Sequence, residues 1–354
     1  MGTHDGGIEK IVQLRNSWTH FQWNGDWSAK SPCWTDVARK QVKLSPDPNT
    51  DTFWMAFDEF IMYFTRFSIC KFVPSYNFTS FKTLISPSGY HLIKMHVATS
   101  LSAGEQTISV SQIDEKCLTR DCGYQYKNCR IIVVRLRNSR NFNDGIEYIN
   151  GSKTFQQRDA FVELGSVPSG TYYIIVEIEY DKQNIYSMQY GSEVCITNYG
   201  AGTTTFGGDD SGLVSLERIL HYAFISKINQ NPPRLKISDM SQRGAPDIIR
   251  YESVDAPEGF NFIYVDNKNR THSYVEEMTY TVYDGVQLML QNDQVARDAL
   301  PPPRHPQGHL DVTSDHSYRL VVPPLGAFMI LLRTAVAGFR TEATCSRNVV
   351  RGGV

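Results

Sequence analysis

Residues 167–176 read VPSGTYYIIV, and residues 322–331 read VPPLGAFMIL. In both stretches a turn rich in proline or glycine comes directly before a run of aromatic, β-branched and other apolar residues, a pattern typical of a buried strand. The stretches lie 155 residues apart. That distance is far too long for a solenoid repeat but fits tandem domains of β-sandwich size. The sequence therefore predicts a mainly β protein with two antiparallel β-sandwiches of the same topology.

The segments around these stretches continue the pattern. Clusters of Gly, Asn, Asp and Pro separate short apolar runs, as turns separate strands. Strands are expected at residues 92–97, 107–112, 130–136 and 172–180.

Between the two β regions the composition changes. Residues 200–212 are rich in Gly, Thr and Asp and are interpreted as a linker. One apolar helical face is expected to follow, because hydrophobic residues then recur at helical spacing. Its members are Leu213, Leu216, Leu220, Phe224 and Ile228. Pro232 and Pro233 are expected to end this helix.

The overall composition is that of an ordinary globular protein. Hydrophobic residues make up 41% and charged residues 20%, and the formal net charge of −2 gives no reason to expect nucleic acid as a partner. No secretory signal is visible at the start, so the seven cysteines are expected to be reduced thiols in the cytoplasm. The spacing of Cys117, Cys122 and Cys129 does not favour a metal site.

The first 70 or so residues form a different unit. All five tryptophans fall between Trp18 and Trp54. Residues 11–15 are expected to form a strand. Phe57, Phe60, Ile61, Phe64 and Phe67 recur at helical spacing, and Asp58 and Glu59 suit the positive end of that helix.

Three motifs in this unit resemble those of the calpain-like cysteine protease family. Residues 14–18 (LRNSW) are similar to its Leu/Ile-Arg-Asn-Pro-Trp, residues 23–28 (WNGDWS) to its Trp-x-Gly-x-Trp-Ser, and residues 53–60 (FWMAFDEF) to its Phe-Trp-Met-Ser-Phe-x-x-Phe. The resemblance covers about sixty residues. It implies the tail of a papain-like α+β protease core followed by C2-like sandwiches, and the second sandwich resembles the tandem arrangement of kinetoplastid calpain-like proteins. The domains expected are residues 1–71 (protease-core tail), 72–200 (first sandwich), 201–229 (linker and helix) and 230–354 (second sandwich).

The resemblance also assigns roles to individual residues. Calpains cleave peptides with a Cys nucleophile, a His base and an Asn that orients the His ring. Asn16 occupies the orienting position, and Trp18 is its neighbour at the protease cleft. The Cys and His of the family align upstream of this chain, and Cys33 and Cys70 fall at non-catalytic places. The chain as given is therefore expected to be a pseudoprotease.

The family's calcium positions are degenerate. The resemblance places the ligands at Gln22, Ala29, Thr50, Asp51 and Thr52, of which only Asp51 carries a carboxylate. No cofactor or metal is therefore expected. The acidic pairs 114–115, 209–210 and 276–277 are interpreted as solvated surface charge.

Three functions stay open at this point. The chain is a non-catalytic interaction protein that binds protein partners, and membranes more weakly, through its sandwiches. Alternatively, it is the C-terminal part of a calcium-dependent cysteine endopeptidase, with peptide substrates, whose Cys and His lie upstream. The third alternative is an isolated lipid-binding module, for which no basic, apolar-tipped loop surface is evident.

Overall fold

The computed structural model describes most of the chain and divides it into two compact units, residues 1–73 and 74–354. The described residues are 9–17, 23–45, 51–84, 89–98, 104–119, 122–138, 142, 145–179, 193–230, 232, 234–243, 246–253, 255–284, 286–289, 308–314, 317–334 and 340–351.

The first unit is small and built around tryptophan. Strand β1 (Ile11–Arg15) pairs antiparallel with β2 (Thr52–Ala56), and helix α1 (Asp36–Val42) begins at Thr35, whose hydroxyl accepts a hydrogen bond from the Ala38 N–H. The unit's core consists of Trp27, Trp34, Ala38 and Ala56. The strand expected at residues 11–15 is confirmed with those bounds.

Helix α2 (Phe57–Tyr63) is shorter than the aromatic spacing predicted. Asp58 and Glu59 do lie in its first turn, but the chain leaves the helix at Phe64. Phe67 therefore lies outside the helix, although its ring still packs at 6.1 Å from that of Phe60. Beyond the helix, Phe67, Ile69 and Phe72 are 69–84% exposed.

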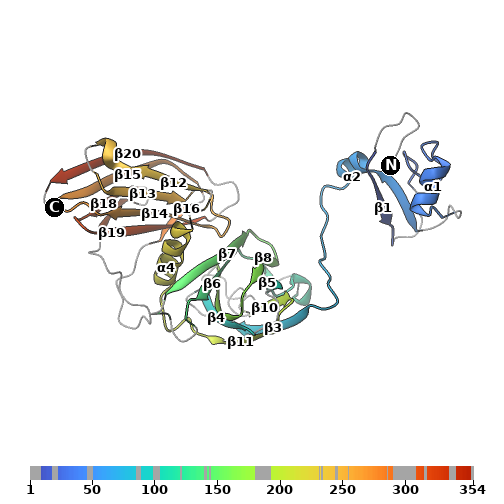
Figure 1. Cartoon of the computed structure of the whole chain (residues 1–354), viewed down its shortest axis with the longest axis horizontal. Coiled ribbons are helices and arrows are strands. Elements are labelled where there is room, and N and C mark those ends of the chain that lie inside the picture. Colours follow the sequence, from blue (N-terminus) through green and yellow to red (C-terminus); the bar gives the residue numbers. More distant parts are fainter. Residues whose placement is uncertain are drawn as a thin grey trace. The chain divides into compact units, whose positions relative to one another are not determined.

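The second unit begins with a sandwich of two antiparallel sheets (Figure 1). One sheet has the order β3-β10-β5-β8 and the other the order β11-β4-β9-β6-β7. Their bounds are β3 (Asn77–Leu84), β4 (Tyr90–Val97), β5 (Gly104–Gln112), β6 (Cys129–Leu136), β7 (Ile146–Thr154), β8 (Asp159–Val167), β9 (Gly170–Ile178), β10 (Glu193–Gly200) and β11 (Thr204–Asp209). The four strands predicted from sequence correspond to β4, β5, β6 and β9.

A second sandwich follows in the same unit. Its sheets have the orders β12-β13-β14-β19-β16 and β17-β18-β15-β20. Their bounds are β12 (Leu235–Asp239), β13 (Ile248–Ser253), β14 (Phe260–Asn267), β15 (His272–Asp284), β16 (Val286–Met289), β17 (His309–Ser314), β18 (Ser317–Val322), β19 (Ala327–Thr334) and β20 (Arg340–Arg351). The chain is thus mainly β, as its sequence predicts.

The two sandwiches share a central topology but not their edges. In the first, β4-β9-β6 and β10-β5-β8 are paired in these orders, and β14-β19-β16 and β20-β15-β18 repeat them in the second. The two Pro/Gly turns of the repeat lead into the equivalent strands β9 and β19. Outside this centre the expectation of identical topology is wrong. In the first sandwich the strand before β4, β3, pairs with β10 of the opposite sheet. In the second sandwich the strand before β14, β13, pairs with β14 itself. It therefore takes the position that β11 has beside β4 in the first sandwich.

The stretch expected to be a linker contains β11. Thr204, Thr205 and Phe206 pair with the edge of β4, and the register then shifts before Asp209. Gly207 lies over Lys94, where an added Cβ would come 3.3 Å from the lysine Cβ. Thr and Phe favour strands, so this segment extends the sheet even though its glycines suggest a linker.

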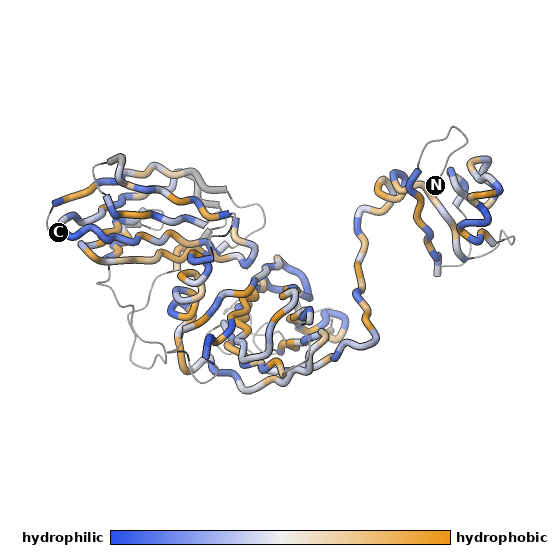
Figure 2. Tube along the Cα trace, in the orientation of Figure 1, coloured by the Kyte–Doolittle hydropathy of each residue, from blue (hydrophilic) through white to orange (hydrophobic). Residues whose placement is uncertain are grey.

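Helix α4 (Leu216–Asn229) packs between the two sandwiches. One hydrophobic cluster combines its buried residues with residues of β4, β6 and β9 on one side and of β14 and β19 on the other. Phe224, for example, stacks on Phe262 of β14 with ring centres 5.0 Å apart. Leu213, expected on the apolar face, precedes the helix and is 48% exposed. Separate clusters fill each sandwich, and Figure 2 shows the hydrophobic and hydrophilic stretches along their strands.

None of the described helices has the length and hydrophobicity needed to cross a membrane.

Candidate functional site

Asn16 lies directly after β1, at the end of the two-stranded sheet where Arg15 pairs with Thr52. Its backbone N–H donates a hydrogen bond of 2.6 Å to the Asp51 carbonyl, one position beyond the last strand pair, Arg15 with Thr52. The β1-β2 ladder thus holds the Asn16 backbone, and the residue is half-buried. The ladder thus fixes the backbone of the residue to which the sequence resemblance assigns the orienting role.

Asp51, the one carboxylate at the expected calcium positions, is already paired. Its Oδ2 lies 2.6 Å from Nε of Arg15, and Thr52 donates to its Oδ1 at 3.2 Å. The hydrogen bond from Arg15 lowers the pKa of the Asp51 carboxyl. Ala29 is exposed and has no side-chain oxygen. Among the described positions of the expected calcium site, Asp51 therefore supplies the carboxylate and Thr52 a hydroxyl.

The tryptophan motif forms a tight turn. The Trp34 indole N–H donates to the Ser28 carbonyl at 2.8 Å, and the Trp27 and Trp34 rings meet edge to face at 4.9 Å. Trp23 lies over Gly25, where an added Cβ would come within 2.2 Å of the indole. The motif therefore needs glycine at this position to let the ring approach the backbone.

Several predicted site residues cannot be placed. Trp18, Gln22 and Thr50 lie outside the described residues, as do both histidines of the unit, His4 and His20. The thiols are described: Cys33 is half-buried against the tryptophan core, and Cys70 is exposed beyond α2.

The first unit is similar in sequence to known proteins. Residues 2–71 match the family model "Calpain family cysteine protease". The Calpain-2 catalytic subunit of Gallus gallus is 33% identical over 70 residues, which are 20% of this chain and 10% of that protein. Calpain-8 of Rattus norvegicus is 34% identical over 70 residues, again 20% of this chain and 10% of that protein.

A plant relative matches the same part of the chain. The calpain-type cysteine protease DEK1 of Arabidopsis thaliana is 36% identical over 66 residues, 18% of this chain and 3% of that protein. The chain thus spans a tenth or less of the curated relatives it matches. Among solved structures, hazelnut vicilin aligns over 78% of this chain and 77% of its own with a TM-score of 0.20 and 8% identity, too low to support an argument. We refer to residues 1–73 as the calpain-type unit.

In the second unit, buried charges join the two sandwiches. Arg130 of β6 is 1% exposed and donates to Glu177 of β9 at 2.9 Å and to the Thr334 carbonyl at the end of β19. Arg333 of β19 donates to the other oxygen of Glu177. Burial raises the pKa of Glu177, although both arginines oppose this shift. One carboxylate therefore binds arginines from both sandwiches.

A second charged contact lies beside α4. Lys227 of the helix donates to Glu258, which is fully buried in the loop before β14. Tyr148 of β7 donates to the same carboxylate at 3.3 Å, and its ring centre lies 4.6 Å from the lysine Nζ. Each group is buried with a partner, as buried charges require.

The sequence interpretation missed these contacts and was wrong about Glu276, one member of an acidic pair. Glu276 is fully buried, not solvated: Arg250 donates to it at 2.7 Å, and the Tyr274 and Tyr318 hydroxyls donate at 2.6 and 2.9 Å. Asp209 accepts from His91, whose side chain is 1% exposed. No sequence signal could have identified these contacts, because partners such as Arg250 of β13 and Tyr318 of β18 lie far away in the chain.

Within the described part of the chain, no group of three or more His, Cys, Asp or Glu side chains could hold a metal ion.

Proposed function

We propose that this chain is a non-catalytic calpain-like protein of the cytosol that acts through tandem C2-like sandwiches. Protein partners are its main ligands, and any association with membranes is weaker. The observation that carries the proposal is the charged joint formed by Arg130, Glu177 and Arg333. Together with α4, it packs the two sandwiches against each other in one compact unit, an arrangement that suits a binding protein.

The outer face of β3-β10-β5-β8 is the surface we assign to a partner. Along one row of this sheet, Thr197 pairs with Ser109, and Ser109 pairs with Phe161. Phe78 and Phe161, on the two edge strands, are 70% and 58% exposed. Exposed aromatic residues around a face of small hydroxyl side chains suit a protein interface, because aromatic side chains are enriched in such surfaces.

The calpain-type unit has a structural role in this proposal. Asn16 keeps its place after β1, but its two catalytic partners align outside this chain. A peptidase needs the thiolate and the imidazole as well as the residue that orients them. This 354-residue chain by itself is therefore expected to cleave no peptide bond.

The test is a casein-cleavage assay with the purified chain, run with calcium and with a chelator. No cleavage above background is expected, and Asn16→Ala should equal the unchanged chain. Cleavage that a thiol-directed inhibitor blocks, and that Cys33→Ser or Cys70→Ser removes, would refute the proposal.

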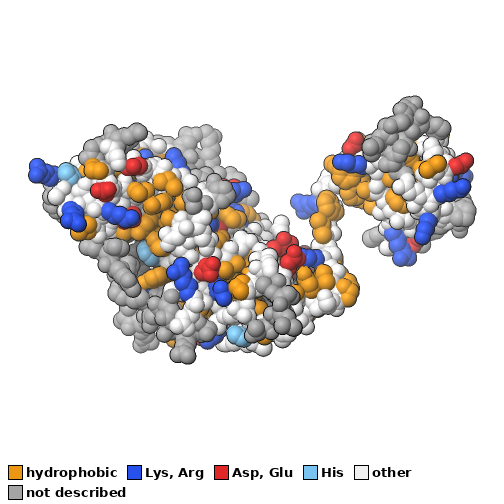
Figure 3. Space-filling view, in the orientation of Figure 1, with side chains coloured by type: hydrophobic (Ala, Val, Ile, Leu, Met, Phe, Trp, Pro, Cys, Tyr) orange, Lys and Arg blue, Asp and Glu red, His pale blue; other side chains and the backbone are white. Residues whose placement is uncertain are grey.

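One observation favours the alternative, a part of a calcium-dependent cysteine endopeptidase completed by other residues. Hydrophobic side chains lie exposed over and beyond α2, among them Met62, Phe67 and Phe72 at 66–77% (Figure 3). The remainder of a protease core would cover such residues. Co-expression with a polypeptide that carries the family's Cys and His separates the two cases. Calcium-dependent cleavage that is lost in Asn16→Ala would establish the alternative.

A further inference from the structure

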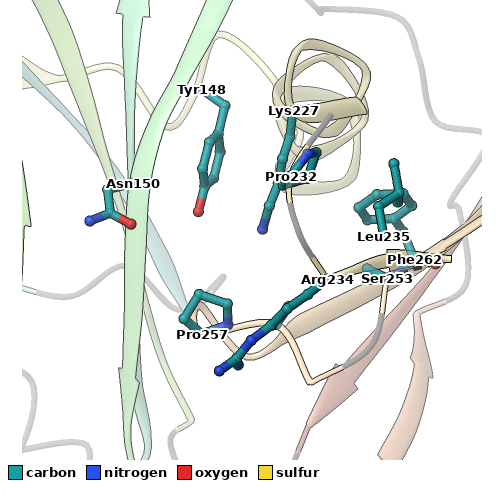
Figure 4. A pocket seen from close by; sticks show the side chains of 10 residues that line it. Tyr148, Asn150, Lys227, Pro232, Arg234, Leu235, Ser253, Pro257 and Phe262 are labelled. Carbon is teal, nitrogen blue, oxygen red and sulfur yellow. Dashed lines mark hydrogen bonds between the residues drawn. The ribbon is translucent and has the colours of Figure 1, made fainter. Parts of the chain in front are cut away.

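A cavity of about 330 Å³ opens between the two sandwiches beside α4. Tyr148 of β7 forms one side, Pro232 and Leu235 form another, and Pro257 and Phe262 complete the apolar wall (Figure 4). The volume falls within the range of small-molecule sites, which combine apolar walls with a few placed polar groups. The proposed protein-binding face does not account for this cavity.

The two cationic side chains that line the cavity differ in what they can bind. Lys227 is neutralised by Glu258 and shielded by the Tyr148 ring. Arg234 is 63% exposed, and its only hydrogen bonds within the described part of the chain run from Nη1 to Asp255. An arginine has five N–H donors, so most of those of Arg234 are open to a ligand. Figure 4 shows the ends of Tyr148 and Lys227 pointing toward the same space, while the Arg234 side chain runs past Pro257 and lies at the edge of the cavity.

The charge at the mouth favours an anion. Asp255 is 64% exposed and lies 3.4 Å from Arg234 and 3.5 Å from the Lys153 Nζ. Two cationic groups thus share one carboxylate. Exposed ion pairs of this kind contribute little stability, so Arg234 can replace its contact with Asp255 by one with an anionic ligand at small cost.

We propose that this cavity binds a small amphipathic monocarboxylate, with its aliphatic or aromatic body against Tyr148 and Phe262 and its carboxylate on Arg234. Arginine suits this role because its planar fork matches the carboxylate geometry. The apolar walls bind the body without hydrogen bonds, so the head group decides which ligands are accepted.

The test is isothermal titration calorimetry on the full chain with decanoate, 4-phenylbutanoate and decylammonium. Saturable binding of one molecule per chain is expected for at least one carboxylate, and decylammonium should bind at least about tenfold more weakly. Arg234→Gln should weaken carboxylate binding about tenfold and leave decylammonium unaffected. Leu235→Trp fills the cavity and should abolish binding.

Arg319→Gln is the matched control, because Arg319 is also exposed and paired with one carboxylate, that of Glu277 at 3.4 Å. Far-UV circular dichroism melting of each variant separates lost binding from lost folding, and Arg234→Gln decides alone if Leu235→Trp does not fold. The proposal is overturned if neither carboxylate gives saturable heat. It is equally overturned if decanoate and decylammonium bind alike and Arg234→Gln behaves as Arg319→Gln does.

Discussion

Replacing Glu258 with Gln should destabilise the sandwich unit strongly. Glu258 is fully buried and is the carboxylate that neutralises Lys227, which is itself 8% exposed. A glutamine keeps an acceptor for the Tyr148 hydroxyl but leaves the lysine charge buried without its partner. Breaking a buried pair in this way costs about 3–5 kcal/mol. Lys227 can escape the buried charge by losing its proton, which for a lysine of ordinary pKa costs about 4.6 kcal/mol at pH 7. This cost is an upper limit on the destabilisation caused by the unpaired charge.

The distribution of tryptophan makes the assay selective. All five tryptophans lie in the calpain-type unit, so their fluorescence reports on that unit alone. Far-UV circular dichroism is dominated by the strands of residues 74–354. In Glu258→Gln the circular dichroism transition should fall by roughly 6–10 °C while the tryptophan transition stays unchanged.

Two controls test the electrostatic reasoning. Glu193→Gln breaks an exposed pair with Lys82 at 2.7 Å and should cost less than about 1 kcal/mol. Lys227→Met combined with Glu258→Gln removes the stranded charge and should recover most of the lost stability. The reasoning is refuted if Glu258→Gln melts like Glu193→Gln, or if the double variant is less stable than Glu258→Gln alone.

Three further outcomes are expected. Calcium titration in the micromolar range should leave tryptophan fluorescence unchanged, because Asp51 is the one carboxylate at the expected ligand positions and calcium needs about six to eight oxygens; a saturable change that Asp51→Ala abolishes would contradict this. Gly25→Ala should lower the tryptophan-monitored stability by about 1–3 kcal/mol, because the new Cβ would meet the Trp23 ring at 2.2 Å; an unchanged denaturation midpoint would count against this packing. Burial on α4, with Arg218 nearby, lowers the pKa of His221 to about 4. Between about pH 6.5 and pH 4 the unfolded chain therefore binds a proton at His221 that the folded chain does not bind. The free energy of unfolding should fall as the pH drops through this range. His221→Gln should show a smaller fall in circular dichroism melting temperature over that range, and an identical fall would rule out His221 as its source.

Local pattern accounts for much of the fold. The apolar runs that become β6 and β9 are nearly fully buried, so most of their residues are hydrophobic on both faces and stand out in sequence. The Pro/Gly turns before β9 and β19 likewise predict the repeat, because turn chemistry acts over a few neighbouring residues.

Motif resemblance predicts the place of Asn16 for a similar reason. The motif that contains Asn16 begins inside the short apolar run that becomes β1, so a local pattern is enough to put this residue at the end of a strand. The cavity beside α4 had no such signal: Tyr148, Lys227, Arg234 and Phe262 come from four separate segments. Only the packing of two sandwiches on one helix brings them together.

The sequence by itself therefore determined the mainly β class, the repeated turn-and-strand units, and the resemblance of the first seventy or so residues to calpains. The tertiary structure decided which charges are buried. Glu276 and Glu277 are identical and adjacent in sequence, yet the first is fully buried against Arg250 while the second is 59% exposed beside Arg319. Successive side chains of a strand point to opposite faces, and whether a face meets a core or water depends on strands far away in the chain.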